Sequence, residues 1–359
     1  MAATLRYPVK AMVMAAGAGT RLRPLTHQTP KPMVPILNRP VLLYTLQNLK
    51  RHGITEVALN LHNHPDMIRS YFKSGEALGM RLEYSYEPRL LGTAGGVKNV
   101  EWFLRGGTFV VMSGDGLTDV DLTDLLEFHR RRRSWATIAL KSVDTRFDYG
   151  VTLTKAGGRI TRFVEKPAWS DIFSNQVNTG IYVFEPSVFS LIPKDREYDF
   201  GHQLWPKLLS QGKPIFGYDM RDTYWCDIGN IPEYRRAHQN VLEGEIRLPM
   251  PGHPIRRDVY VGDRTLIHRS ARLHPPIVIG DRCRIDANAV IGPYTVMGHN
   301  VRIRTGAEVS RCTLWNDIVV GEKVRLESCI VSHQTRILGR GASYEGATIV
   351  QTAADPATP

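Results

Sequence analysis

The chain has 359 residues, which is too long for one ordinary compact core, so two domains are expected. Its apolar content of 42% and charged content of 23% exclude a disordered or fibrous protein. The formal net charge of +11 permits a nucleic-acid partner, but it equally suits an enzyme that handles small polyanions. Because no aromatic-basic RNA motif accompanies the charge, we expect no nucleic-acid partner.

Membrane and secretory roles are also not expected. No apolar run approaches the roughly 20 residues that a membrane-spanning helix needs, and the first ten residues, MAATLRYPVK, lack the apolar segment of a secretory signal. The four cysteines, Cys226, Cys283, Cys312 and Cys329, form no CxxC pair and no disulfide-framework spacing. The sequence therefore predicts a reducing, cytoplasmic setting.

The first 246 residues alternate short β-branched runs with amphipathic stretches, which is typical of an α/β layered domain. We expect strands at 10–14, 56–61, 81–86, 108–113 and 136–143, then near YGVTLT, ITRFVEK and GIYVFEP. The expected helices are VLLYTLQNLKRHG, DMIRSYFKSG, GGVKNVEWFL and LTDLLEFHRR, followed by HQLWPKLLSQG and PEYRRAHQNVLEG. Asp119 and Asp121 precede LTDLLEFH and are expected to cap that helix.

A composition change at RLPMPGHP, residues 247–254, marks a linker, and a six-residue period follows it. Short periods of this kind predict a parallel β-helix, in which each flat face contributes one inward residue per repeat. We therefore expect a hexapeptide-repeat domain over residues 254–350, with WNDI as a disruption before a second register around VVGEKVRLESCIV. Residues 351–359 have the composition of a disordered tail. The six-spaced residues are Ile279, Ile285, Ile291, Met297, Ile303 and Val309, and small or apolar partners follow four positions later at Cys283, Ala289, Thr295, Val301 and Ala307.

The segment GAGTRLRPLTHQTPKPM, which follows the first expected strand, combines a bare backbone with two cations. Glycine lets backbone N–H groups approach phosphate oxygens, and the guanidinium of Arg21 and the ammonium of Lys31 suit a polyphosphate. The segment lacks the GxxxxGK[ST] pattern of a P-loop. Leu22 and the prolines also exclude a good dinucleotide fingerprint.

The segment resembles the signature of the sugar-1-phosphate nucleotidyltransferases, also called nucleotide-sugar pyrophosphorylases. Further family-like segments follow in the same order: LGTAGG, SGDGLTD, DYG, FVEKP, VNTGIYVFEP and YWCDIGN. The resemblance covers roughly residues 9–245, and a hexapeptide tail is common in the family. It implies a Rossmann-like mixed sheet followed by a left-handed parallel β-helix. The sequence differs from the commonest form of the family motif at Ala16, where many members have glycine.

The resemblance implies Mg²⁺-dependent attack of a sugar-1-phosphate on the α-phosphorus of a nucleoside triphosphate, with release of pyrophosphate. A phosphate monoester is already largely ionised at neutral pH because its second pKa is about 6, so no general base is required. The protein must align two polyanions and neutralise charge, which calls for cations and carboxylate-held Mg²⁺. Asp115, at the end of a buried-looking strand, is the first candidate metal ligand, and Asp227 resembles the family's second.

The candidate site residues fall into four groups. The catalytic candidates are Arg21, Lys31, Asp115 and Lys166, and the metal candidates are Asp115 and Asp227. The nucleotide-binding candidates are Ala15, Ala16, Gly17, Gly19, Thr20, Arg21, Glu87, Gly92 and Thr93. By resemblance, the sugar-phosphate side is lined by Gly150, Glu165, Lys166, Asn178 and Thr179.

The base is inferred from Glu87. Guanine presents two adjacent donors that one carboxylate can accept together, whereas uracil and thymine present one donor between two acceptors. If Glu87 points inward, GTP is favoured, and LGTAG also resembles mannose-1-phosphate guanylyltransferases. We therefore expect GTP and mannose-1-phosphate to give GDP-mannose. A glucose-1-phosphate uridylyl-, thymidylyl- or adenylyltransferase and a non-catalytic regulatory relative are the alternatives.

Acyl transfer is a further alternative, because left-handed β-helices are often found in acyltransferases. That chemistry would use a histidine between coils, and the available residues are His268, His274, His299 and His333. The predicted helix is only about five coils long and has no visible acceptor-binding insert, so we expect no acyl transfer. By family resemblance the β-helix serves regulation or a homo-oligomer, since pairing would cover its open hydrogen-bonding ends.

Overall fold

The computed structural model describes residues 8–143, 149–168 and 172–351. By its internal contacts the chain forms two compact units. The first comprises residues 1–18, 30–33 and 41–227, and the second comprises residues 19–29, 34–40 and 228–359. The predicted tail, apart from Gln351, and Asp148 of the DYG segment lie outside the described residues.

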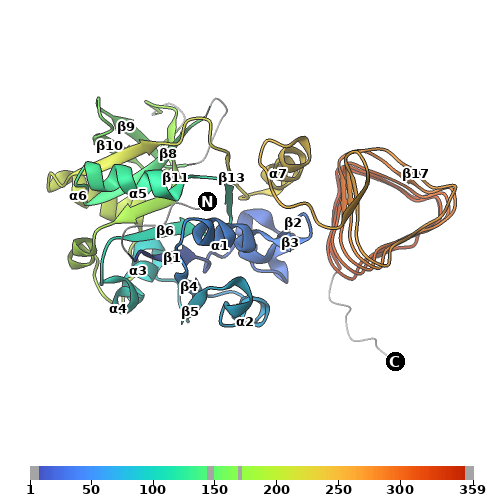
Figure 1. Cartoon of the computed structure of the whole chain (residues 1–359), viewed down its shortest axis with the longest axis horizontal. Coiled ribbons are helices and arrows are strands. Elements are labelled where there is room, and N and C mark those ends of the chain that lie inside the picture. Colours follow the sequence, from blue (N-terminus) through green and yellow to red (C-terminus); the bar gives the residue numbers. More distant parts are fainter. Residues whose placement is uncertain (1–7, 144–148, 169–171, 352–359) are drawn as a thin grey trace. The chain divides into compact units, whose positions relative to one another are not determined.

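The first unit is built on a nine-stranded mixed sheet (Figure 1). Four strands run parallel: β1 (Lys10–Met14), β4 (Glu56–Leu61), β5 (Arg81–Tyr86) and β6 (Phe109–Ser113). The antiparallel strand β11 (Gln176–Phe184) joins β6 to β8 (Ala136–Ser142), β9 (Val151–Thr154) and β10 (Ile160–Val164). Strand β12 (Ile215–Asp219), which the sequence analysis did not anticipate, pairs parallel with β8. The predicted Rossmann-like mixed sheet is confirmed.

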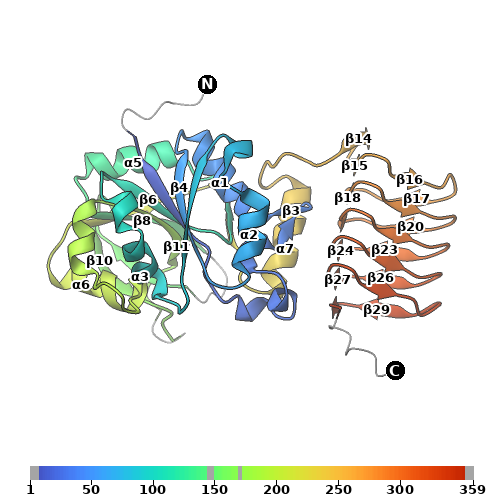
Figure 2. The same ribbon diagram turned by 90° about the horizontal axis from the view of Figure 1, so that it is seen from below.

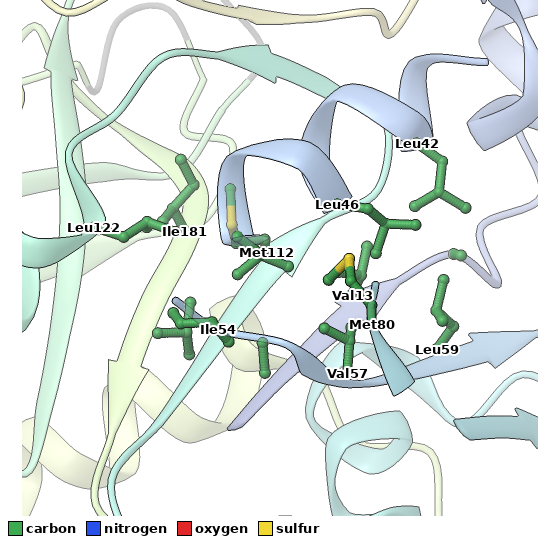
Figure 3. Close-up of a cluster of buried hydrophobic side chains, with 14 of the residues drawn as sticks. Val13, Leu42, Leu46, Ile54, Val57, Leu59, Met80, Met112, Leu122 and Ile181 are labelled. Atoms are coloured by element: carbon green, nitrogen blue, oxygen red, sulfur yellow. The ribbon is translucent and has the colours of Figure 1, made fainter. Parts of the chain in front are cut away.

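Alternation along β1 divides the apolar side chains between two cores. Ala11 and Val13 face a cluster formed with α1 (Val41–Arg51), α2 (Pro65–Phe72) and α5 (Leu122–Arg131), part of which Figure 3 shows around Val13 and Met112. Met12 faces the other cluster, formed with α3 (Gly92–Asn99), α4 (Glu101–Leu104) and α6 (Trp205–Ser210). Period-two burial in a strand covered on both faces produces this three-layer arrangement.

Helix boundaries follow their local signals with two corrections, at Asp119 and at Val100. Asp121 caps α5 by accepting hydrogen bonds from the backbone N–H groups of Thr123 and Asp124, as predicted, whereas Asp119 accepts from the backbone of Tyr224. The single helix expected for GGVKNVEWFL is wrong, because Val100 leaves helical geometry at φ −106° and ψ 19° and divides it into α3 and α4. A π-helical turn at Phe200–Leu204, capped by Asp199, precedes α6.

The second unit contains α7 (Ile231–Glu243), the short hairpin of β2 (Pro35–Ile36) and β3 (Arg39–Pro40), and the repeat region. The repeats form three parallel sheets on the faces of a coil with a triangular section (Figure 1), and the coils stack as in Figure 2. One face holds β14 (His253–Arg256), β15 (Val259–Val261), β18 (Ile277–Ile279), β21 (Thr295–Met297), β24 (Thr313–Leu314), β27 (Ile330–Val331) and β30 (Thr348–Ile349), with β14 antiparallel at the end. The others hold β16 (Leu266–Ile267), β19 (Arg284–Ile285), β22 (Arg302–Ile303), β25 (Val319–Val320) and β28 (Arg336–Ile337), and β17 (Arg272–Leu273), β20 (Val290–Ile291), β23 (Glu308–Ser310), β26 (Arg325–Glu327) and β29 (Ser343–Glu345).

The inward positions of the repeat are confirmed. Every one of the predicted six-spaced residues and their partners is at most 1% exposed. Val278 pairs with Val296, 18 positions later, but Val296 pairs with Thr313, only 17 positions later. The missing residue lies between Val309 and Leu314, which explains the second register predicted from the sequence.

All four cysteines are buried, and Cys283 packs as a small apolar group. Burial raises the pKa of the Cys283 thiol to about 11, whereas a hydrogen bond with Cys312 lowers the pKa of the Cys329 thiol to about 7. A thiol with a raised pKa stays neutral at physiological pH and is a poor nucleophile. None of the helices in the described part of the chain combines the length and apolar composition that crossing a lipid bilayer requires.

Thr295 provides a test of the inward positions. It is completely buried, and its hydroxyl oxygen has no hydrogen-bond partner among the described residues. Thr295→Val should therefore raise the free energy of unfolding by about 1 kcal/mol, because an unsatisfied buried hydroxyl is removed. The reverse change at the equivalent position of the next face, Val301→Thr, should lower it by about 1–3 kcal/mol. Urea denaturation followed by circular dichroism measures both, and a loss of stability in Thr295→Val would contradict the assignment.

Candidate active site

A cavity of about 290 Å³ lies at the carboxyl ends of β1, β4 and β6 in the first unit. Ligands of open α/β sheets bind at this edge. Met14, Asn60 and Ser113 each come from the end of one of these strands. The lining residues are Met14, Ala16, Gly17, Lys31, Pro32, Asn60, Glu87, Leu90, Gly92, Thr93, Ser113, Asp115, Glu197 and Asp199.

Lys31 joins the two predicted metal carboxylates. Its ammonium forms an ion pair with Asp115 and a second one with Asp227 Oδ1 at 3.2 Å. Lys31 comes from a 3₁₀ turn at Lys31–Met33, and Asp115 lies in the turn after β6. Asp227 ends β13 (Trp225–Asp227), which pairs antiparallel with β7 (Gly116–Thr118) and sets Asp227 opposite Gly116. Three segments that are distant in sequence thus meet at one cation.

Burial and charge act in opposite directions on this cluster. Burial alone would lower the pKa of the Lys31 ammonium, but the attraction of Asp115 and Asp227 and their hydrogen bonds outweigh it, so the pKa is raised. Burial would raise the pKa of the Asp115 carboxyl, but Lys31 and the hydroxyl of Ser113 lower it on balance. Lys31 and Asp115 are therefore charged at neutral pH, because each pKa shift favours the charged form.

The same two carboxylates fit a magnesium ion. Both converge on one cationic group, and carboxylate oxygens are ligands that Mg²⁺ accepts readily. Among the described residues, no third histidine, cysteine or carboxylate joins them to make a closed metal site. An open shell of this kind leaves coordination positions for phosphate oxygens and water, as is usual for Mg²⁺ at nucleotide sites.

Glu87 points inward and is held firmly. It is 1% exposed, and its Oε1 accepts a hydrogen bond from Asn60 Nδ2 at 2.8 Å while its Oε2 accepts one from the Leu91 N–H at 3.0 Å. Asn60 also accepts from the Ala15 N–H at 2.8 Å, so it connects the predicted glycine-rich loop with Glu87. Each carboxylate oxygen retains capacity for a second hydrogen bond.

The LGTAGG segment opens α3 beside this network. Gly92 has φ +73°, and a Cβ there would lie 2.7 Å from the Tyr198 carbonyl oxygen. The hydroxyl of Thr93 donates to Asp199 Oδ2 at 2.7 Å and accepts from the Phe200 N–H at 2.8 Å. These contacts fix Thr93 and Asp199 together in the wall of the cavity.

On the predicted sugar-phosphate side, Gly150, Glu165 and Asn178 lie together. A Cβ on Gly150 would stand 2.7 Å from Glu165 Oε2, and the Gly150 carbonyl accepts from the Asn178 N–H at 2.8 Å. Asn178 also donates to the Tyr182 hydroxyl at 3.0 Å. The predicted residues therefore form a local group carried by β11 and the segments before β9 and after β10.

Thr179 and Lys166 have contrasting environments. Thr179 is buried, and its hydroxyl donates to the Ala139 carbonyl at 2.7 Å while its own carbonyl accepts from the Trp225 indole at 3.0 Å. Lys166 is exposed, with φ +41°. Positive φ is unusual for a residue with a side chain and costs of order 1–3 kcal/mol, and such strain clusters at functional sites.

The second half of the glycine-rich segment belongs to the second unit. Gly19, at φ +63°, precedes a 3₁₀ turn at Thr20–Leu22 that carries the exposed Arg21. Of the described residues that line the cavity, Gly17 is the last from this loop before Lys31. Ala15, Ala16 and Gly17 thus lie with the cavity's unit, whereas Gly19, Thr20 and Arg21 are part of the other.

The four histidines considered for acyl transfer have separate surroundings. His268 contacts the Ser270 hydroxyl, His299 pairs with Asp281, and the His333 ring packs against Trp315 at 4.7 Å between ring centroids with the ring planes tilted by 55°. Burial lowers the pKa of His333. Within the described residues no metal-capable cluster involves any of them, nor does His274 belong to one.

Sequence reasoning missed Asn60, Ser113, Glu197 and Asp199. Asn60 left a signal, because an amide inside the apolar run EVALNL must find partners when it is buried. Asp199 precedes a helical turn and could have been read as its cap. For Glu197 the sequence carries no such signal.

Comparison with known proteins agrees with this geometry. The nucleotidyl transferase family model matches residues 10–244, and a model of the GMPPB C-terminal domain matches residues 273–355. The chain belongs to the nucleotidyl transferase family. Its relatives are sugar-1-phosphate nucleotidyltransferases, so the predicted family and enzyme class are confirmed.

Individual relatives differ in substrate. A UTP–glucose-1-phosphate uridylyltransferase of Synechocystis is 42% identical over 71% of this chain and 69% of its own length. A mannose-1-phosphate guanylyltransferase of Mycobacterium tuberculosis is 36% identical over 75% and 72%, and a mannose-1-phosphate guanyltransferase of Candida albicans is 33% identical over 95% and 91%. A solved structure described as a glucose-1-phosphate thymidylyltransferase of Bacillus anthracis superposes with a TM-score of 0.60 at 26% identity, covering 67% of this chain and 97% of that one.

Gly96 offers a test of the network around Glu87. A Cβ on Gly96 would lie 2.7 Å from Glu87 Oε1 and 2.8 Å from Asn60 Nδ2, two atoms that are already bonded to each other. Gly96→Ala should therefore lower the free energy of unfolding by about 1–3 kcal/mol and weaken nucleotide binding, because neither side chain can move without losing a bond. Gly106→Ala is the matched control, since a Cβ at Gly106 meets nothing within 4 Å. Calorimetric melting and nucleotide titration measure the two effects, and equal behaviour of both variants would contradict the role of the network.

Proposed function

We propose that this chain transfers a nucleotidyl group from GTP to mannose-1-phosphate with the help of Mg²⁺, forming GDP-mannose and pyrophosphate. The observation that carries the reaction type is the Lys31 ammonium between Asp115 and Asp227, at the carboxyl edge of the sheet and beside a glycine-rich loop. The family membership supports the same chemistry.

In the proposed reaction an oxygen of the sugar phosphate attacks the α-phosphorus of the triphosphate. A P–O bond forms to the sugar phosphate, and the bond to the β-phosphate oxygen breaks as pyrophosphate leaves. Mg²⁺ held by Asp115 and Asp227 would neutralise phosphate charge. Lys31 and Arg21 would stabilise the triphosphate and the charge that develops on it, and Lys166 would hold the sugar phosphate.

The sugar and the base would be held on separate sides. Glu165, Asn178, Thr179 and the backbone of Gly150 would contact the sugar, while Ala15, Ala16, Gly17, Gly19, Thr20, Gly92 and Thr93 would surround the nucleotide. The inward position of Glu87 supports guanine, because its fixed carboxylate can accept two adjacent donors. The match to the GMPPB C-terminal domain and the guanylyltransferase relatives support the same choice.

A second candidate is transfer from UTP to glucose-1-phosphate. The Synechocystis relative with that printed activity is 42% identical, which is higher than the identity of the guanylyltransferases above. The two candidates share every catalytic step and differ only in the base and the sugar.

The proposed setting is cytoplasmic, and the proposed assembly is a homo-oligomer. The four buried cysteines, whose spacing matches no disulfide framework, support a reducing compartment. The terminal strands β14 and β29 of the repeat region are exposed along their length, and open edges of this kind favour pairing.

Pyrophosphate release tests the substrates directly. GTP, UTP, dTTP and ATP are each combined with mannose-1-phosphate and with glucose-1-phosphate in the presence of Mg²⁺. We expect the highest kcat/KM with GTP and mannose-1-phosphate. Preference for UTP and glucose-1-phosphate would replace the proposed substrates with the second candidate, and release with no pair would contradict the proposed function.

Glu87→Gln should reduce the preference for GTP over UTP, since an amide cannot accept two donors at once.

Asp115→Asn tests the carboxylate cluster. The amide keeps the shape but loses the charge that faces Lys31 and the proposed Mg²⁺, so kcat should fall by a factor of about 10² or more. Near-native turnover at saturating Mg²⁺ would exclude Asp115 as a metal ligand. Circular dichroism verifies that the variant is folded.

A further inference from the structure

A continuous chain of buried hydrogen bonds connects the repeat region with the segment that follows Lys31. Trp315 Nε1 donates to the Tyr234 hydroxyl at 2.9 Å, and the Tyr234 hydroxyl donates to the Pro35 carbonyl at 2.7 Å. Tyr234 is 0% exposed and Trp315 is 2% exposed. An indole N–H can only donate, so the direction of both bonds is fixed.

The Pro35 carbonyl is fully occupied. It also accepts a hydrogen bond from His238 Nε2 at 3.2 Å, one helical turn beyond Tyr234 on α7. Burial lowers the pKa of His238 to about 4, so the ring stays neutral and must carry its proton on Nε2 to donate this bond. Both lone pairs of one carbonyl are thus bound to α7.

The neighbouring hairpin is held in the same unit. Val34, Ile36 and Leu37 are completely buried, and the side-chain amide of Asn38 donates to the Met297 carbonyl in the β-helix at 2.7 Å. The Pro35 backbone is therefore fixed both by α7 and, through its own hairpin, by a coil.

The repeat itself does not require a large side chain at the position of Trp315. In the preceding coils the corresponding backbone positions are Gly262, Gly280 and Gly298, whose N–H groups bond to the next coil as that of Trp315 does. A Cβ on Gly280 or Gly298 would come within 2.6 Å of the next coil. The three preceding coils thus have glycine at this position and the following coil has Ser332, whereas the large indole contributes its contact with Tyr234.

The chain between Lys31 and Pro35 has little conformational freedom. The intervening sequence is Lys31–Pro32–Met33–Val34–Pro35, in which both prolines have fixed φ and also restrict the residues before them. Pro35 is thus joined to Lys31 by a short segment of restricted rotation. The Lys31 ammonium must meet two carboxylates at once, so it tolerates little displacement.

From these contacts we infer that Trp315 is a positioning residue for Lys31, acting through Tyr234 and Pro35. The inference rests on the proposed role of Lys31 in nucleotidyl transfer. It assigns the β-helix coil that contains Trp315 a part in turnover, beyond any part in assembly.

Trp315→Phe tests the inference, because it keeps an aromatic ring and removes only the N–H donor and part of the ring. We expect kcat to fall about 5- to 20-fold with the KM for the sugar phosphate unchanged, since small misplacements of catalytic groups have effects of this order. Tyr234→Phe should have a similar effect. The double variant should be no worse than Tyr234→Phe alone, because both changes break the same chain. A fall of kcat in the double variant equal to the product of the two single-variant falls would overturn the inference.

Hydrogen exchange supplies a readout that does not depend on activity. In Trp315→Phe, amides of residues 33–39 should exchange faster, while those of β1 remain as in the native protein. Trp205→Phe is the buried control: its indole N–H has no partner among the described residues, so no hydrogen bond is lost, but the smaller ring leaves a cavity. This variant should have a lower melting temperature with unchanged exchange at residues 33–39. Trp102→Phe is the exposed control and should change neither.

The outcomes separate the two proposals. If the native protein releases no pyrophosphate with any substrate pair, the proposed function fails while exchange at residues 33–39 still tests the hydrogen-bond chain. If Trp315→Phe lowers the melting temperature but leaves kcat and exchange at native values, Trp315 has only a structural role and the inference is wrong.

Discussion

The active-site edge of the first unit depends on one buried ammonium group between two carboxylates. Lys31 is only 9% exposed, and a charge removed from water to this extent is strongly unfavourable unless it is paired. Asp115 and Asp227 supply the pairing, and each arrives from a different strand. Because one side chain bonds to both, the β6–β7 turn and β13 must meet the Lys31 turn in one arrangement. The cluster therefore specifies geometry, and it carries a net charge of −1 that suits a divalent cation.

Asn60 has a comparable role on the nucleotide side. A single amide accepts from Ala15 and donates to Glu87, so the loop after β1 and the segment after β5 are set relative to β4. Gly96 permits α3 to approach this pair closely, since any side chain there would meet both polar atoms. The wall of the cavity is thus held by hydrogen bonds between the segments at the strand ends.

The sequence predicts features that arise from local periodicity. The strands at 10–14, 56–61 and 81–86 and the inward residues of the hexapeptide repeat follow from alternation and six-residue spacing, which each segment displays by itself. The ion pairs of Lys31 and the bonds of Asn60 and Asp199 depend on pairing between segments up to 196 residues apart, which no local pattern encodes. The break at Val100 was missed for a related reason: EWFL continues the apolar pattern of α3, so no local signal marks the end of that helix. Family resemblance located Lys31, Asp115 and Asp227, but it did not place Asn60 or Trp315.

The repeat region shows how a regular fold can acquire a specific contact at little cost to itself. A β-helix coil requires small residues where its backbone approaches the next coil, as Gly262, Gly280 and Gly298 show. Shortening one corner by a single residue, between Val309 and Leu314, changes the path of the chain directly before Trp315. At that point a large side chain fits in place of glycine and reaches Tyr234. An irregularity in the repeat thus coincides with the contact between Trp315 and Tyr234, whereas the preceding coils keep glycine there and the following coil has Ser332.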